Sequence, residues 1–172
     1  MTFPTNEGKS FADSLFVMGG RPVIEALKQP PVSTRQAMHP GEKVVPVKLE
    51  IPVEPLLDES AGELGLRSWL AAHDQAAEIA AAWQGDRYCL FADGETLGVV
   101  WDIRFTSSEV ADRWLAEASG IVTRGFGLAE PPQVGKPVTT ASGRSVLVHR
   151  IDPTTVRFAN AASMETLNKL AR

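Results

Sequence analysis

The sequence is poor in the residues from which catalytic, metal and disulfide sites are usually built. Its only cysteine, Cys89, excludes a disulfide within the chain and is expected to be a packed, unreactive thiol. Its three histidines, His39, His73 and His149, lie far apart and share no metal-ligand spacing. There is no G-x-S-x-G element, and no glycine-rich phosphate loop ends in Lys followed by Ser or Thr. The sequence therefore predicts no catalytic residue, no metal site and no cofactor.

The sequence also lacks a strong excess of charge of one sign and any long apolar run. The 172 residues carry a formal net charge of -4, which gives no electrostatic support for a nucleic-acid partner. No apolar run approaches the roughly 18–20 residues that cross a bilayer. Residues 1–6 lack the basic stretch and apolar core of a signal peptide. We therefore expect a soluble globular protein with no membrane span, for which a protein or peptide partner stays open. The sequence sets neither compartment nor oligomeric state.

The sequence does contain an N-terminal segment, residues 1–42, with several residues that typically end or begin helices. The glycine pair at 19–20 ends one helix, and the proline pair at 30–31 ends the next because proline donates no backbone hydrogen bond. Ser33 can then cap a last short turn that stops before Pro40. These helix-ending and helix-capping residues predict a helical hairpin.

The expected hairpin has an apolar stripe formed by Val23, Leu27 and Met38. Because a stripe of this size cannot form a core alone, we expect the hairpin to dock on the sheet domain, with a second copy of the chain as the other available surface. His39, at the end of the last turn, is expected to close that helix end by bonding a free carbonyl group. A contact with a partner is the alternative role for His39.

The segment from near Gly8-x-x-Phe11 through Pro40 resembles a family of bacterial zinc metallopeptidases, and from Gly19 to Pro40 it follows the pattern G-G-x-x-x-V-x-x-L-x-x-x-P-P-x-S-T-x-Q-x-x-H-P. The likeness continues more loosely through residues 62–65 and 85–88. In that family an upstream H-E-x-x-H helix and a later acidic residue hold the zinc, and many members are exported or lipid-anchored. This chain has no H-E-x-x-H, so the resemblance carries no catalytic residue onto it. If the chain is a processed fragment, the resemblance implies an exported protein.

Two functions follow from these observations. The first is a non-catalytic binding or regulatory module that resembles the C-terminal, post-zinc-site part of the metallopeptidase family. The alternative is a fragment of a zinc metallopeptidase that is active only with a zinc-bearing region supplied elsewhere. A weaker third reading is a small independent enzyme that uses an open sheet face, which would need polar groups converging in one pocket.

Residues 43–60 are expected to form an extended, Pro-rich connector. Apolar residues alternate from Val45 to Ile51, which suits a strand, but Pro46 and Pro52 confine such a strand to the edge of a sheet. The acidic residues of this stretch are expected to be solvated, with a cation site as the alternative.

Residues 61–172 carry the patterns of an α+β domain. Two short helices are expected at 66–73 and 76–83, followed by the order β-β-α-β-β-α. The strands of that order are expected at 87–91, 97–105, 144–151 and 155–160, and its helices at 107–122 and 163–171. Because hairpins join the strands, we expect an antiparallel sheet, with the helices on one face. Thr106 and Glu109 form a candidate capping box.

Two groups of side chains in this domain are candidates for binding. The tryptophans Trp69, Trp83, Trp101 and Trp114 each fall on the apolar side of an element, so core packing is expected and a lined pocket is the alternative. The arginines Arg144, Arg150 and Arg157 belong to the second hairpin, where they are either a solvated sheet face or a site for an acidic partner. With His39, they are the candidate partner-binding residues.

Overall fold

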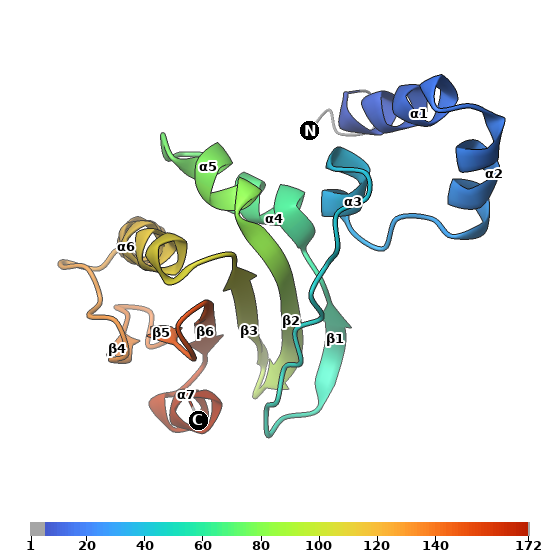
Figure 1. Cartoon of the computed structure of the whole chain (residues 1–172). Coiled ribbons are helices and arrows are strands. Elements are labelled where there is room, and N and C mark those ends of the chain that lie inside the picture. The colour runs from blue at the N-terminus through green and yellow to red at the C-terminus, as the bar shows by residue number, and fades with distance from the viewer. Residues whose placement is uncertain (1–5, 172) are drawn as a thin grey trace.

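The computed structural model describes residues 6–171 and has an α+β architecture built on one six-stranded antiparallel sheet (Figure 1). The strand order is β1-β2-β3-β6-β5-β4. The strands are β1 (Pro55–Glu59), β2 (Trp83–Asp93), β3 (Thr96–Phe105), β4 (Val138–Thr139), β5 (Ser145–Arg150) and β6 (Thr155–Ala161). The helices are α1 (Glu7–Val17), α2 (Gly20–Lys28), α3 (Thr34–Met38), α4 (Gly62–Trp69), α5 (Ala76–Ala81), α6 (Ser108–Gly125) and α7 (Met164–Leu170).

Two hairpins form the centre of the sheet, as the sequence predicts. β2 and β3 are joined at Asp93 and Gly94, and Gly94 has the positive φ of 65° that this tight turn requires. β5 and β6 are joined at Asp152, whose carboxylate accepts hydrogen bonds from the backbone amides of Thr154 and Thr155 at 2.8 Å each. β3 then pairs with β6 and closes the two hairpins into one antiparallel sheet.

The helices cover both faces of the sheet, so the prediction that they lie on one face is wrong. α4, α5 and α6 pack on the face that carries Trp101, Ile103 and Phe158. α7 packs on the opposite face, against Val100 and Ala159. The reason is that neighbouring positions of β3 and β6 are both apolar, and their side chains point to opposite faces. Each face therefore needs its own cover.

The connector also differs from the prediction. No strand forms at 45–51, and the edge strand β1 lies later, where it pairs antiparallel with β2. Leu49, Ile51 and Val53 instead pack against the apolar cluster on the α7 face. The prolines at 46 and 52 remove backbone donors, so this stretch contributes side chains to the core without joining the ladder.

Local signals place several element boundaries to within one or two residues, but α4 lies at 62–69 rather than at 66–73, and β2 begins at Trp83 rather than at 87. Ser107, not Thr106, caps α6, because its hydroxyl accepts the amide of Val110. Trp83, expected on a helix face, is the first residue of β2, since α5 ends at Ala81. Its indole is nonetheless fully buried in the core, as predicted.

The N-terminal helices form where the glycine and proline pairs predict, but only part of the segment docks on the sheet domain. We call residues 6–32, with α1 and α2, the arm; it extends away from the sheet (Figure 1). Leu27 is 80% exposed, so its expected burial against the sheet domain is wrong. Docking is made by α3, which packs beside α4 through polar contacts.

Candidate functional sites

The α3–α4 joint is the first candidate site, and it is built from the segment that follows the proline pair at 30–31 and from the start of α4. Ser33 caps α3 by accepting the Gln36 amide, and the Gln36 side chain accepts the amide of Val32 at 2.9 Å. Thr34 reaches across to α4, where its hydroxyl oxygen accepts the Leu64 amide at 3.1 Å. The segment thus caps two helices at once, its own and the next.

Gly62 allows this close approach of α3 to α4. Its φ is +71°, a left-handed conformation that favours glycine, and a Cβ atom there would lie 2.5 Å from the hydroxyl oxygen of Thr34. Any other residue would strain the backbone and displace Thr34.

A buried carboxylate, Glu63, lies at the centre of the joint. Arg35 Nη1 donates to its Oε2 at 2.7 Å, and His39 Nε2 lies 3.2 Å from its Oε1. Arg35 also donates to the Ala81 carbonyl at the end of α5, at 2.5 Å. The His39 imidazole therefore meets a carboxylate rather than the free helix carbonyl that the sequence predicts. The joint pairs Glu63 with the Arg35 guanidinium and connects α3, α4 and α5.

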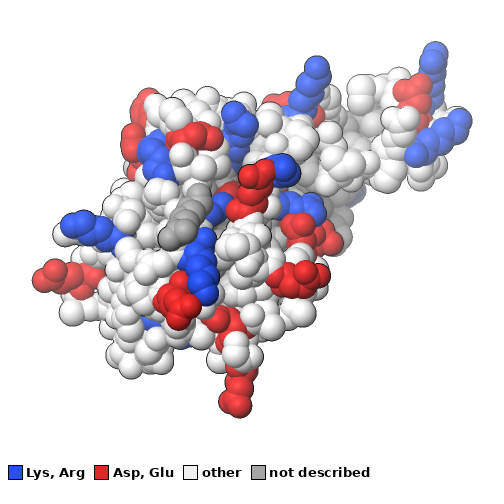
Figure 2. All heavy atoms as spheres, turned by 90° about the horizontal axis from the view of Figure 1, so that it is seen from below, with Lys and Arg blue, Asp and Glu red and all other residues white. Residues whose placement is uncertain are grey.

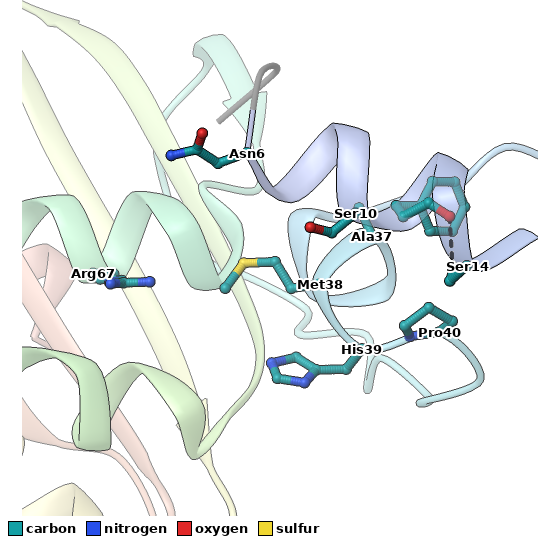
Figure 3. A pocket seen from close by; sticks show the side chains of 9 residues that line it. Asn6, Ser10, Ser14, Ala37, Met38, His39, Pro40 and Arg67 are labelled. Atoms are coloured by element: carbon teal, nitrogen blue, oxygen red, sulfur yellow. Dashed lines mark hydrogen bonds between the residues drawn. The ribbon is translucent and has the colours of Figure 1, made fainter. Parts of the chain in front are cut away.

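A hollow of about 420 Å³ adjoins the joint (Figure 3). It is lined by Asn6, Ser10, Phe11, Ser14, Ala37, Met38, His39, Pro40 and Arg67. The Ser14 hydroxyl donates to the Phe11 carbonyl of its own helix at 2.7 Å, and the His39 Nε2 atom contacts the Glu63 carboxylate. No contact in the described residues pairs a serine hydroxyl with His39, so the hollow shows no nucleophile–base pair of the kind that covalent catalysis requires.

The second candidate site, which we call the Trp groove, lies on the sheet face opposite α7. Its volume is about 310 Å³, and its lining residues are Ala61, Gly65, Trp69, Tyr88, Leu90, Val99, Trp101 and Phe158. The rings of Trp69 and Trp101 meet edge to face, with centroids 5.7 Å apart. On its other side Trp69 stacks on the buried Trp114, at 5.6 Å. Three of the four tryptophans are buried core residues, as predicted, while Trp69 and Trp101 also supply a groove wall and floor.

Asp86 holds this groove in shape. Its carboxylate is 5% exposed and accepts five hydrogen bonds. Two come from the indoles of Trp83 and Trp101, at 3.1 and 2.7 Å, and two from the backbone amides of the N-cap residue Ala61 and of Gly62, the first residue of α4. The fifth comes from the Ser60 hydroxyl, at 2.6 Å. Asp86 was not among the site residues expected from the sequence, because no local pattern distinguishes it from an ordinary carboxylate beside a strand.

The three candidate arginines are not brought together. Arg144 and Arg150 lie at opposite ends of β5, where Arg144 binds Asn160 and Arg150 pairs with Asp112 of α6. Arg157 is 5% exposed on the α7 face, paired with Asp102. No common basic surface results, and over the visible face of the molecule cationic and anionic side chains alternate (Figure 2).

His149 lies on the α7 face, directly opposite Arg157 in the β5–β6 ladder. Burial first and the Arg157 charge second lower the pKa of His149 from its usual 6.5, against the smaller opposing effect of Asp102. The folded state therefore resists protonation that the unfolded chain accepts, and stability is lost as the pH falls through about 6.5.

We accordingly expect His149→Gln to reduce the loss of stability on acidification. Urea unfolding of both proteins at about pH 7.5 and pH 5.5 measures this, because the carboxylates common to both cancel in the comparison. Equal losses in the two proteins would contradict the assignment.

The environments of Cys89 and His73 give no support for a catalytic role. Cys89 is 1% exposed, and burial, aided by the charge of Asp58, raises the pKa of its thiol. His73 bridges to Glu117 and Arg124 of α6. Among residues 6–171, no three His, Cys, Asp or Glu side chains are grouped to hold a metal ion. In the same part of the chain, no helix is both long and apolar enough to span a membrane.

The sheet, both hairpins and the Trp groove fall within a known sequence family. Residues 54–171 match a domain of unknown function (DUF8575), and the chain belongs to this family. The match begins just before β1, so the arm and α3 lie outside it. No curated protein and no solved structure shows significant similarity to the chain.

Proposed function

We propose that the protein is a non-catalytic binding module whose Trp groove receives apolar side chains of a protein or peptide partner. The observation that carries the proposal is the groove itself, a hollow of about 310 Å³ with almost entirely apolar walls. Sites of this kind bind by excluding water from apolar surface, and tryptophan and tyrosine are enriched where such binding is strongest.

Rigidity of the groove supports a binding role. Trp101 is held from behind by Asp86, and Trp69 is held between Trp101 and Trp114. A wall that is already ordered loses little conformational entropy when a partner arrives. The groove lining contains no ionisable side chain other than Tyr88, so it lacks the acid, base or nucleophile that a reaction would need.

The apolar dye anilinonaphthalene sulfonate tests this site. We expect wild-type protein to bind the dye, measured as dye fluorescence that is excited by energy transfer from tryptophan. Val99→Glu should reduce this fluorescence at least tenfold, because a carboxylate in the groove opposes apolar contact. Val134→Glu is the matched control, since Val134 is 48% exposed and lies outside the groove. An unchanged signal in a folded Val99→Glu variant, judged by circular dichroism, would refute the assignment.

The α3–α4 joint favours one alternative, a zinc metallopeptidase fragment that works with a zinc-bearing region supplied elsewhere. Its support is that Thr34, Gln36 and His39, which carry the family resemblance, all make contacts at this joint. Reading the coding frame upstream of Met1 for H-E-x-x-H tests this alternative. The binding-module proposal expects no stoichiometric zinc in the dialysed chain, and zinc that is lost on changing His39 or His149 would overturn it.

A further inference from the structure

The arm leaves an unusual share of large apolar side chains uncovered. Of the eleven large hydrophobic residues that are exposed in the described chain, six lie in the arm, between 54% and 88% exposed. They are Phe16, Val17, Met18, Ile24, Leu27 and Val32. The other five are spread over the much longer remainder of the chain. Such clustering marks an interaction surface rather than scattered surface residues.

The helices of the arm are too short to be stable without cover. α1 has 11 residues and α2 has 9, whereas isolated helices below about 12–15 residues are marginal in water. α2 is strongly amphipathic in sequence, yet none of its residues is buried. The described part of the chain leaves Ile24 and Leu27 of α2 uncovered, so covering them requires a partner.

We propose that the arm is a dimerisation element, in which the exposed apolar residues at the α1–α2 junction and on α2 pack against the same residues of the arm of a second copy. A symmetric contact of this type needs a surface that is compatible with itself. Residues 1–40 carry four Lys and Arg against three Asp and Glu. Lys9 pairs with Asp13 and Arg21 with Glu25, so two arms approach without like-charge repulsion.

The size of the surface fits a dimer. A large apolar side chain offers on the order of 100 Å², so the six offer roughly 600 Å² in total over the arm, a large part of the ~800 Å² that each partner buries in a stable interface. A lipid surface fits less well, because membrane-binding helices concentrate Lys and Arg, and the arm is nearly neutral. This inference is independent of the Trp groove.

Sedimentation equilibrium of the full chain over a wide concentration range tests the proposal. We expect wild-type protein to have the mass of a dimer, and Leu27→Glu to weaken dimerisation at least tenfold while circular dichroism stays unchanged. Leu97→Glu is the matched control, because Leu97 is 55% exposed on the β2–β3 hairpin, away from the arm. It should remain dimeric, as should Val99→Glu in the Trp groove.

Several results would overturn the proposal. These are a monomeric wild-type protein at every concentration, a dimer that survives Leu27→Glu, and a dimer that dissociates in Val99→Glu, which would place the interface at the groove. Binding of a monomeric wild-type protein to vesicles of phosphatidylcholine and phosphatidylserine would assign the arm to a lipid surface instead. Should Leu27→Glu lose helical signal, Ile24→Glu repeats the test under the same criteria.

Discussion

Replacing Asp86 with alanine is expected to lower the free energy of unfolding by more than about 4 kcal/mol, because each buried donor left unsatisfied costs about 1–3 kcal/mol. The carboxylate satisfies both indoles behind the groove and the backbone amides of Ala61 and Gly62 at the start of α4. Within residues 6–171, Asp86 is the acceptor that each of these four donors contacts. Urea unfolding followed by tryptophan fluorescence measures the loss.

Asp58→Ala is the control for this experiment. Asp58 lies on the neighbouring strand β1 and pairs with Arg87 at 2.5 Å, but both side chains are exposed to solvent. Its loss should cost no more than about 1 kcal/mol. The loss in the free energy of unfolding for Asp86→Asn should lie between those of Asp86→Ala and Asp58→Ala, because the asparagine oxygen still accepts hydrogen bonds while its NH₂ group faces other donors. Similar small losses for Asp86→Ala and Asp58→Ala would show that the buried network contributes little.

The second large effect is expected for Arg157→Ala, at about 3–5 kcal/mol, because it leaves a buried carboxylate without its cation. Arg157 donates to both oxygens of Asp102, at 2.7 Å each, and to the Leu170 carbonyl at the end of α7. The substitution therefore also loosens the helix that covers this face. Chemical unfolding at neutral pH gives the value.

The surface pair of Arg150 and Asp112 provides the comparison. Arg150→Ala should cost no more than about 1 kcal/mol, since Asp112 is well exposed and is readily solvated. The double variant Arg157→Met, Asp102→Leu should recover most of the stability lost in Arg157→Ala, because an apolar pair removes the stranded charge as well as its partner. A double variant as unstable as Arg157→Ala would show that the ion pair is itself the source of stability.

Signals confined to a few neighbouring residues predicted much of this fold. The glycine pair at 19–20, the proline pair at 30–31 and the Ser33 cap place three helices correctly, because each acts on the backbone within one helical turn. The Asp93–Gly94 turn and the alternating residues of β3 likewise identify a hairpin without any distant contact.

Sites formed by residues far apart in sequence were not predictable in the same way. In the sequence, Asp86 has no feature that separates it from an exposed carboxylate, and only the fold brings α4 and two indoles around it. Arg157 likewise resembles a surface arginine in the sequence, and only the fold brings it to Asp102, 55 residues away. The Trp groove is similar, since α4 and strands β2, β3 and β6 each supply part of its wall.

The sequence by itself determined the α+β class, the antiparallel hairpins and the approximate positions of most helices, because backbone conformation responds to local caps, turns and hydrophobic period; α4 was placed four residues too late. Only the tertiary structure decided that helices cover both faces, that the arm stays uncovered and that the three arginines separate. Each of these depends on which face meets which partner, and the free energy of burial is set by that pairing rather than by any residue's immediate neighbours.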